Sequence, residues 1–494
     1  MSEKNMEQTI LEWYQKNYKF IDAPCDGKGN CGRCKVRFFS DAPMPQEKDK
    51  KLLSQEEIDE GIRLACVTKM PKTVCFEPVF KVTELQREVV VHLSELAEEY
   101  GVAIDIGTTT IAMCLVSLLT GEKVATITAV NKQRVYGADV ISRIQASNEG
   151  KLLEMQYCIQ QELFELLLQL IDQSEIDAGQ IKKLVIVANT TMCHILLGHS
   201  CIGLGKAPFT PVDISLRKMS IGELLGKVEA AKRFSAQVTI FPSISVFVGG
   251  DIVAGIYACD MDLKEEPHML LDIGTNGEMV VGNQNGFYVT STAAGPVFEG
   301  GNISCGMPAV EGAIAHIACQ NGQWKWEILG YQKEKEAVGF CGSGLVDLTA
   351  ELWKQGLIDE NGTITEEFFD CGVPIGSFRI LQSDIREIQM AKAAIRAGME
   401  VLKEKYVAKR VLLAGGLGTV LNVDSAIEIG LFPREIENNI LPVGNTALAG
   451  AIRFLRDEMG EKRVTDIVRK SQELTLANEG NFEENYILFL QFLL

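Results

Sequence analysis

A short hairpin motif occurs twice in the sequence, and this repeat constrains the fold more strongly than any other feature. An apolar strand, a D-x-G-T turn and a second strand span residues 102–116, and the same order recurs at 270–282. The two aspartates of these turns, Asp105 and Asp272, lie 167 residues apart. Each hairpin continues past a further turn, LTGE or NQNG, into another β-rich run. The repeat predicts a pseudo-symmetric chain in which two such hairpins face each other.

The chemistry of the repeated turn suits a nucleoside triphosphate. A Gly-Thr turn presents consecutive N–H groups and hydroxyls to phosphate oxygens, and an aspartate at the strand end can hold hydrated Mg²⁺. A third element at 411–433 is a buried strand that ends in Gly415, Gly416 and Gly418 before a helical segment. Glycines there would let the backbone approach a nucleoside closely, although a plain strand-to-helix turn has the same pattern. The P-loop signature, GxxxxGK followed by Ser or Thr, does not occur, so a P-loop is excluded.

The N-terminal 80 residues are organised around cysteine. Four cysteines have the spacing C-x5-C-x2-C-x31-C, and two sulfide-bridged iron atoms need four thiolates. The glycines Gly27, Gly29 and Gly32 let the loop wrap a cluster and turn backbone N–H groups toward sulfur. The spacing resembles the 2Fe-2S ferredoxins, and its first gap of five residues is closer to the adrenodoxin type than to the plant type. The expected ligands are Cys25, Cys31, Cys34 and Cys66.

Two alternatives to this ligand set stay open. C-x2-C pairs also bind zinc, although zinc sites usually show two close pairs and here the fourth cysteine stands alone. Cys75, on the alternating segment TVCFEP, is most simply a buried strand thiol and is otherwise a substitute for Cys66. Only 24 residues precede Cys25, and most of them, TILEWYQKNYKF, have the pattern of a helix. The head is therefore expected to be a trimmed β-grasp domain with a more exposed cluster.

Charge and composition exclude several classes of partner. The formal charge of −18 argues against nucleic acid, because phosphate binding needs a basic face. Residues 1–80 contain 13 Lys and Arg against 13 Asp and Glu, so the acidic excess lies downstream of the head. The sequence has neither a secretory signal pattern nor a run of about 20 apolar residues, which indicates a cytoplasmic protein without a membrane partner. The 14 cysteines are then expected to be reduced thiols and metal ligands.

With these elements in place, residues 101–456 resemble the actin, hexokinase and heat-shock-chaperone ATPase superfamily. That resemblance implies an α/β fold with two RNase-H-like lobes and ATP·Mg²⁺ in the cleft. Together with the ferredoxin-like head, the chain resembles the ATP-dependent reductive activators of corrinoid proteins. The strings that support this narrower match are NTTMCHILLG (189–198), APFTP (207–211), GGDIVAG (249–255), AGPVFEGGNISCGM (294–307), CGSGLVDL (341–348), QMAKAAIRAG (389–398) and VGNTALAGA (443–451).

The resemblance also gives the expected domain organisation. A 2Fe-2S ferredoxin-like domain at 1–80 is followed by a linker at 81–100, ATPase lobe I at 101–265 and ATPase lobe II at 266–456. A C-terminal extension at 457–494 is expected to pack on the ATPase. Its closing string YILFLQFLL is apolar, but nine residues are too few to span a membrane.

The activity that the resemblance implies is reactivation of a corrinoid protein. An ATP-hydrolysing iron-sulfur enzyme of this kind reduces inactive Co(II) to Co(I) by one electron, in support of corrinoid-dependent methyl transfer. Its cofactors are a 2Fe-2S cluster, ATP and Mg²⁺. Its partners are the corrinoid protein and a low-potential electron donor protein, and a homodimer is compatible with the resemblance.

Each motif residue then has an expected role. Asp105 and Asp272 position Mg²⁺ as catalytic residues, and Asp251 either orients the hydrolytic water or caps a helix N-terminus. Glu278, on the second hairpin, is a further candidate. His194 lies on an apolar helical stretch and is expected to be a packed histidine rather than a metal ligand. The expected nucleotide-binding residues are Gly107, Thr108, Thr109, Thr110, Gly274, Thr275, Asn276, Gly415, Gly416 and Gly418.

Two other functions fit part of the sequence. Activators of 2-hydroxyacyl-CoA dehydratases share the ATPase fold but hold a 4Fe-4S cluster between two subunits. Here Cys305 and Cys341 are the positions from which such a cluster could be built, and the four-cysteine head would then be redundant. A sugar or acetate kinase with an accessory cluster is the second alternative, and phosphorylation of a small substrate would identify it.

Overall fold

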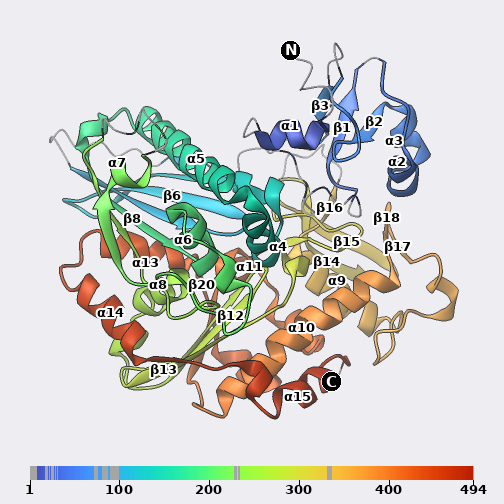
Figure 1. Cartoon of the computed structure of the whole chain (residues 1–494). Coiled ribbons are helices and arrows are strands. Elements are labelled where there is room, and N and C mark those ends of the chain that lie inside the picture. The colour runs from blue at the N-terminus through green and yellow to red at the C-terminus, as the bar shows by residue number, and fades with distance from the viewer. Residues whose placement is uncertain are drawn as a thin grey trace. The chain divides into compact units, whose positions relative to one another are not determined.

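Figure 1 shows a computed structural model of the chain. Contacts divide the chain into two compact units: unit 1 is Met1–Phe241 with Ala451–Asp457, and unit 2 is Pro242–Gly450 with Glu458–Leu494. Among the described residues no helix is long and apolar enough to cross a membrane. The structure describes residues 8–16, 21, 23, 27, 29, 32–39, 41–71, 76–79, 87–89, 99–226, 228, 231, 234–330 and 337–492.

The head begins with the helix that the pattern of TILEWYQKNYKF predicts. Helix α1 (Ile10–Lys16) buries its apolar side chains, and the Leu11 N–H donates to the Ala65 carbonyl at 3.0 Å. Three short strands form an antiparallel sheet of order β2-β1-β3, whose central strand alternates inward- and outward-facing side chains. The other elements of the head are β1 (Lys35–Phe38), α2 (Glu47–Leu52), α3 (Gln55–Asp59), β2 (Ile62–Leu64) and β3 (Phe76–Pro78).

The larger sheet of unit 1 has seven strands in the order β4-β7-β6-β5-β8-β10-β9. At its centre β5 (Tyr100–Ile106) is antiparallel to β6 (Thr110–Ser117) and parallel to β8 (Ile181–Ala188). Nearly every residue of β5 is buried, as expected for a strand covered on both faces. The long helix α5 (Leu152–Gln173) packs on β6 (Figure 1). The remaining elements are β7 (Lys123–Val130), η2 (Lys132–Tyr136), α4 (Val140–Ala146), α6 (Thr190–Leu197), β9 (Arg217–Ser220), α7 (Ile221–Leu224) and β10 (Gln237–Ile240).

Part of the segment expected to be a linker belongs to this sheet. Strand β4 (Arg87–Val89) pairs antiparallel with β7, and Arg87 lies opposite Ile127. The connection between the head and the ATPase is therefore a strand at the sheet edge over these three residues, not a plain tether. A run of three residues is too short for its alternation to be recognised in the sequence.

Unit 2 is built on a six-stranded sheet of order β20-β19-β11-β12-β13-β21. Strand β11 (His268–Ile273) is antiparallel to β12 (Gly277–Asn283) and parallel to β19 (Arg410–Ala414). Helix α10 (Gln382–Lys403) packs on β12 and β13. The other elements are α8 (Gly250–Ala258), β13 (Gly286–Thr292), β14 (Ala313–Gln320), β15 (Gln323–Ile328), β16 (Gly339–Phe340), α9 (Gly342–Lys354), β17 (Val373–Ile375), β18 (Phe378–Ile380), α11 (Gly415–Val420), α12 (Val423–Glu428), β20 (Ile440–Gly444), α14 (Gly460–Lys470), β21 (Ser471–Glu473) and α15 (Phe482–Leu488). Helix α13 (Thr446–Phe454) begins in unit 2 and ends in unit 1.

The two units repeat one arrangement of strands. In each, three consecutive strands are antiparallel, β5-β6-β7 and β11-β12-β13, and the first of them has a parallel neighbour, β8 or β19. Both D-x-G-T sequences lie at the turn between the first and second strands. The hairpins predicted at 102–116 and 270–282 are confirmed, and so is the strand-to-helix element at 411–433.

The C-terminal segment is held on α10 by a buried lysine. Lys392 is fully buried, and its ammonium donates to the carbonyls of Phe489 at 2.5 Å and Gln491 at 2.7 Å. These carbonyls follow α15, where a helix end leaves acceptors that need a donor. Phe492 is 1% exposed, and its ring centre lies 6.2 Å from that of Trp353. The apolar end of the chain therefore contributes to the core of unit 2.

Phe492→Ala should destabilise unit 2 by about 3 kcal/mol, because loss of a buried ring removes apolar contacts and leaves a cavity. The matched control is Ile487→Ala on α15, where the side chain is 61% exposed; it should change stability by less than about 0.5 kcal/mol. Hydrogen exchange of the α10 amides and thermal unfolding measure both variants. Equal stability of the two would contradict docking of the C-terminal segment.

Candidate functional site

The first D-x-G-T turn, between β5 and β6, has its carbonyl oxygens bonded to protein donors. The Gly107 carbonyl accepts from the side-chain amide of Asn131, and the Thr109 carbonyl accepts from its backbone N–H, each at 2.9 Å. The Thr108 carbonyl accepts from the Arg143 guanidinium at 2.5 Å. The C=O and N–H of a trans peptide point in opposite directions, so the amides of these peptides point away from Asn131 and Arg143. Backbone N–H groups at such a turn favour an anion.

Two further contacts fix the first turn. Asn189, the N-cap of α6, donates to the Thr108 hydroxyl at 3.1 Å. The Gly107 N–H donates to the Thr110 carbonyl at 2.8 Å, which closes the hairpin. Arg143 is fully buried, and burial, with a smaller contribution from Arg134, lowers its pKa to about 9. The buried guanidinium therefore holds the Thr108 carbonyl in place.

Four carboxylates gather around the second D-x-G-T turn, within unit 2. Asp272 near the end of β11 lies opposite Glu278 of β12 in register. Asp251 lies in the first turn of α8, and its charge raises the pKa of both. Glu299 accepts from the Thr275 hydroxyl at 2.6 Å, and its charge also raises the pKa of Asp272. The turn therefore concentrates negative charge that comes from three separate segments.

This concentration of charge favours a cation. Burial first, and then Asp251 and Glu299, raise the pKa of Asp272 to about 7. Burial, Asp251 and Asp272 raise the pKa of Glu278 well above its usual range. A divalent cation can replace protons as the counter-charge, and Mg²⁺ prefers oxygen ligands. Among the residues that the structure describes, no group of three or more His, Cys, Asp or Glu side chains is placed to hold a metal ion, so Mg²⁺ at this turn stays a prediction.

The remaining residues of the second turn are held by local contacts. The Gly274 N–H donates to the Asn276 carbonyl at 3.0 Å, and the Asn276 side chain donates to Glu278 at 3.3 Å. Thr275 is engaged by Glu299, as described above. The predicted phosphate-binding residues of both hairpins thus lie in their turns, while their contacts with phosphate remain predictions.

The two remaining acidic candidates differ in their surroundings. Asp105 lies on β5 opposite Ala112, one residue before the strand ends. Asp251 is not a helix cap, because Gly249 is the N-cap of α8 and the Asp251 carboxylate accepts from the Ile252 N–H at 2.8 Å. The helix-cap alternative for Asp251 is therefore wrong. Its place near Asp272 leaves a role on the hydrolytic water as the prediction.

The three glycines after β19 differ in what a side chain at each position would contact. Gly415 has a φ of +81°, and a Cβ there would lie 2.7 Å from Asp272 Oδ1, so this glycine makes room for the carboxylate. A Cβ on Gly418 would lie 2.7 Å from the Leu413 carbonyl, so close packing against β19 explains the glycine at this position. A Cβ on Gly416 would meet nothing within 4 Å. Of the three, Gly416 has the open space that a close nucleoside contact requires.

In the head, the structure brings two of the four predicted ligands into neighbouring segments. The Ala65 N–H, next to Cys66, donates to the Cys34 carbonyl at 2.7 Å. A Cβ on Gly27, whose φ is +75°, would lie 3.9 Å from Cys66 Cβ. Cys34 is 1% exposed and Cys66 is half-buried, while the exposure of the cluster as a whole stays a prediction. Outside the described residues lie Cys25, Cys31 and Cys75.

His194 is a packed histidine, as predicted. It is fully buried; its Nδ1–H donates to the Thr190 carbonyl at 2.8 Å, and its Nε2 accepts from the Val212 N–H at 3.1 Å. Burial lowers the pKa of its ring. With both nitrogens bonded to backbone, the ring anchors the segment after the string APFTP.

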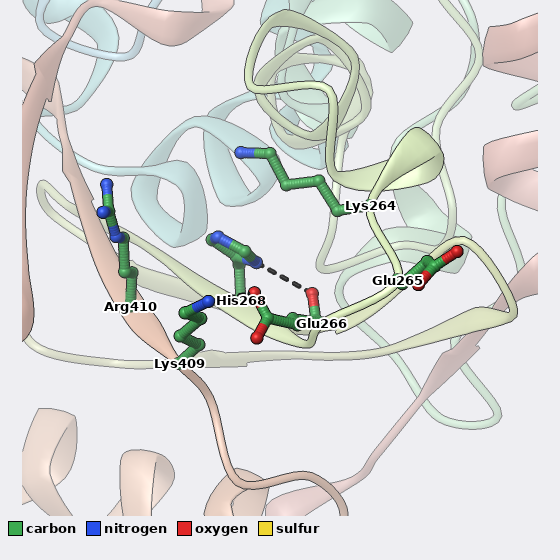
Figure 2. A pocket seen from close by; sticks show the side chains of 6 residues that line it. All are labelled: Lys264, Glu265, Glu266, His268, Lys409 and Arg410. Carbon is green, nitrogen blue, oxygen red and sulfur yellow. Dashed lines mark hydrogen bonds and ion pairs between the residues drawn. The ribbon is translucent and has the colours of Figure 1, made fainter.

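A surface hollow in unit 2 lies at the other end of the strands that carry the carboxylates. It adjoins the starts of β11 and β19 (Figure 2). Asp272, by contrast, is one residue before the end of β11, and Gly415 directly follows β19. Within the hollow the His268 ring donates to the Glu266 carbonyl at 2.9 Å, and Lys409 pairs with the Glu266 carboxylate. The hollow is therefore distinct from the predicted nucleotide site. Its lining residues are Lys264, Glu265, Glu266, His268, Lys409 and Arg410.

Sequence reasoning missed four residues that shape the two turns. Asn131 directly follows the third strand of the first repeat, and Asn189 opens the string NTTMCHILLG, so both had a positional signal. Glu299 lies within AGPVFEGGNISCGM. Arg143 had no such signal in the sequence, because an arginine on a helix is usually a surface residue.

Three family models together match nearly the whole chain. The model for the C-terminal domain of RACo, the ASKHA domain, matches residues 266–493, and the model for the RACo middle region matches residues 100–264. A model for a 2Fe-2S iron-sulfur cluster binding domain matches residues 2–71. The predicted fold class, a ferredoxin-like head on an actin-like ATPase, is confirmed. The domain boundaries given by the sequence stay a prediction.

The chain is also similar, along most of its length, to proteins named for corrinoid activation. The corrinoid activation enzyme RamQ of Eubacterium limosum is 32% identical over 428 residues, which cover 80% of this chain and 70% of that protein. The Co(II) methylated amine-specific corrinoid protein reductase of Methanosarcina barkeri is 24% identical, over 80% of this chain and 77% of that protein. The solved structure of a reductive activator for corrinoid, iron-sulfur protein is 26% identical, with a TM-score of 0.72 and coverage of 99% of this chain and 96% of that one.

The carboxylates of the second turn should make the stability of unit 2 depend on pH. Folding raises the pKa of Asp272 from near 4 to about 7, so the folded state binds more protons than the unfolded state between these values. Stability should therefore fall as pH rises from about 4 to 7, and Asp272→Asn should remove part of this fall.

Added Mg²⁺ should restore stability to the wild type above about pH 7 and should have little effect on Asp272→Asn. Thermal unfolding of both proteins near pH 5.5 and pH 8, with and without Mg²⁺, measures the difference. If thermal stability changes equally with pH in the two proteins, Asp272 does not titrate as described.

Proposed function

Because the chain belongs to the family of reductive activators of corrinoid proteins, we propose that it couples ATP hydrolysis to one-electron reduction of a partner corrinoid protein from Co(II) to Co(I). The chain is an iron-sulfur ATPase of corrinoid activation. The observation that carries the proposal is that one chain combines a cysteine head with a carboxylate-lined phosphate turn. The product, Co(I), is the form that accepts a methyl group in corrinoid-dependent methyl transfer.

The nucleotide roles follow from the two turns. Asp272, with Glu278 and Asp251 near it, is assigned to Mg²⁺, and Asp105 is assigned the corresponding role on the first hairpin. The donor-lined first turn is assigned to phosphate oxygens, because its carbonyls are already bonded to protein. Gly416 is assigned to the nucleoside. Asp251 is assigned to the hydrolytic water.

The cluster roles belong to the four head cysteines. Cys25, Cys31, Cys34 and Cys66 are assigned to a 2Fe-2S cluster, which when bound supplies a one-electron carrier. The chain's own contribution is to bury Cys34 and to hold the Cys66 segment against it through the Ala65 N–H. Burial and backbone N–H groups near sulfur are the means by which a protein tunes such a site.

ATP is needed because the electron transfer is uphill. Ferredoxin-type clusters have reduction potentials near −400 mV, and reduction of Co(II) to Co(I) requires a more negative potential than that. ATP can help only through differential binding, for example if the nucleotide state changes the affinity for the Co(II) form of the partner. For a one-electron step, each tenfold preference moves the equilibrium by about 59 mV. A low-potential donor protein must supply the electron, in a cytoplasm that keeps thiols reduced.

The described thiols argue against a dehydratase-type activator. Cys341 is 1% exposed, and its Sγ lies 3.4 Å from the Ile314 carbonyl and 3.3 Å from the Ser343 hydroxyl. Burial, with Asp384, raises the pKa of Cys305 to about 12. A cluster shared between subunits needs exposed thiolates, and the buried Cys341 does not offer one.

Nucleotide and cluster functions should separate in two variants. Asp272→Asn should keep the cluster spectrum but weaken ATP-dependent reduction on the order of 100-fold, because loss of one carboxylate in a metal site costs about that much. Cys34→Ser should do the reverse and keep nucleotide binding while it loses reduction. Asp424→Asn, on an exposed residue of α12, is the control and should match the wild type. A cluster lost in Asp272→Asn would contradict this separation.

Cys341→Ser tests the shared-cluster alternative. We expect iron and sulfide contents equal to those of the wild type, because Cys341 packs in the interior of unit 2 and ligates nothing. Analysis of iron and sulfide in the purified proteins gives the answer. Loss of a cluster in this variant would favour the dehydratase-type activator.

A further inference from the structure

Helix α1 of the head packs on the segment that follows the first phosphate turn. Gln15 Nε2 donates to the Val135 carbonyl at 2.6 Å, and the Tyr136 hydroxyl donates to the Gln15 carbonyl at 3.3 Å. A side chain of each element thus satisfies a backbone carbonyl of the other. The Gln15 carbonyl lies in the last turn of α1, where helix carbonyls lack partners within the helix. Tyr136 is 1% exposed, so its hydroxyl needs such an acceptor.

Asn131 joins the start of this segment to the phosphate turn. It is fully buried and is the N-cap of η2, and its Oδ1 accepts from the Gln133 N–H at 2.9 Å. Its side-chain amide and backbone N–H hold the carbonyls of Gly107 and Thr109. A single residue therefore fixes both the first turn of η2 and the turn between β5 and β6.

Arg143 joins the other end of the segment to the same turn. Its Nε donates to the carbonyl of Gly137, the C-cap of η2, at 3.0 Å, and its guanidinium also holds Thr108. Val135 and Tyr136, between the two clamps, are each 1% exposed. The segment is clamped at both ends and buried between them, so a shift of the phosphate turn must be accompanied by a shift of η2.

Helix α1 is at the same time part of the wall of the cysteine site. The Leu11 N–H donates to the Ala65 carbonyl, next to Cys66, and a Cβ on Gly27 would lie 3.1 Å from Leu11 Cδ2. The segment after the head also joins the sheet of unit 1, because β4 pairs with Ala125–Ile127 of β7, the strand that Asn131 follows.

We propose that residues 131–137, the docking segment, are a docking surface for the chain's own cluster domain, and that nucleotide at the first phosphate turn strengthens this docking. The inference rests on the proposed function for the identity of the ligand at the turn. Phosphate oxygens bonded to the turn amides polarise the peptides whose carbonyls accept from Asn131 and Arg143, and buried chains of hydrogen bonds strengthen one another. The docking segment is then held in the conformation that receives Gln15.

The coupling has a thermodynamic consequence that can be measured. If nucleotide strengthens docking by some factor, docking strengthens nucleotide binding by the same factor. Residues that touch only the head and the docking segment must then influence ATP affinity. The ATP-bound enzyme keeps its cluster domain docked on the ATPase, and loss of the phosphates loosens it.

The test uses the full-length protein with its cluster assembled. The double variant Gln15→Ala/Tyr136→Phe removes both hydrogen bonds between α1 and the docking segment and leaves Asn131, Arg143 and the cysteines in place. We expect its Kd for MgATP to rise about 5-fold, the lower end of typical coupling. Gln55→Ala, an exposed glutamine on α3, is the matched control and should bind MgATP like the wild type. An unchanged Kd in the double variant would overturn the coupling.

Hydrogen exchange gives a second readout that a purely structural contact would not move. MgATP should slow exchange of the α1 and η2 amides in the wild type, but only of the η2 amides in the double variant. If MgATP does not change the exchange rate of the α1 amides in the wild type, the coupling is also overturned. If the double variant does not fold, the single variant Tyr136→Phe replaces it in both measurements. Neither readout needs a corrinoid protein, so a failure of Co(II) reduction counts against the proposed function and not against the coupling.

Discussion

A turn can bind phosphate through its amides only if its carbonyl oxygens are engaged elsewhere. In the first hairpin Asn131 and Arg143 meet this condition, and much of unit 1 serves to place them. Strand β7 has to end at Asn131, and α4 has to bring a fully buried guanidinium to the turn. The second hairpin uses the opposite electrostatics, because its carboxylates repel an anion unless a cation is present. The first turn therefore suits phosphate oxygens, and the second suits a cation.

The same clamp gives the cysteine head a physical connection to the nucleotide. An uphill electron transfer can use ATP only if some element differs between nucleotide states and reaches the electron carrier. The docking segment is such an element, since it is bonded to the phosphate turn at both ends and to α1 between them. Helix α1 in turn lies against the segment that carries Cys66. A short path of hydrogen bonds thus links the ATPase to the wall of the cluster site.

The sequence predicted those parts of the site whose signal is local. Both hairpins could be predicted because strand, D-x-G-T turn and strand are contiguous, and the cysteine spacing is a local signature in the same sense. Arg143 could not be predicted, because its role depends on a tertiary contact with Thr108 that leaves no periodicity behind. The close approach of Gly415 to Asp272, which lies 143 positions earlier in the chain, could not be predicted for the same reason, while its contact with a nucleoside stays a prediction. Of the two roles expected for Asp251, the helix cap is excluded because Gly249 is the N-cap of α8.

We propose that this chain drives an electron onto cobalt at the expense of ATP. The absorption of Co(I) can be followed after the reduced protein is mixed with a Co(II) corrinoid protein, with and without MgATP. We expect Co(I) to accumulate with MgATP and to form to a much smaller extent without it. Reduction that is equal in both conditions, or absent from both with the cognate corrinoid protein, would contradict this proposal.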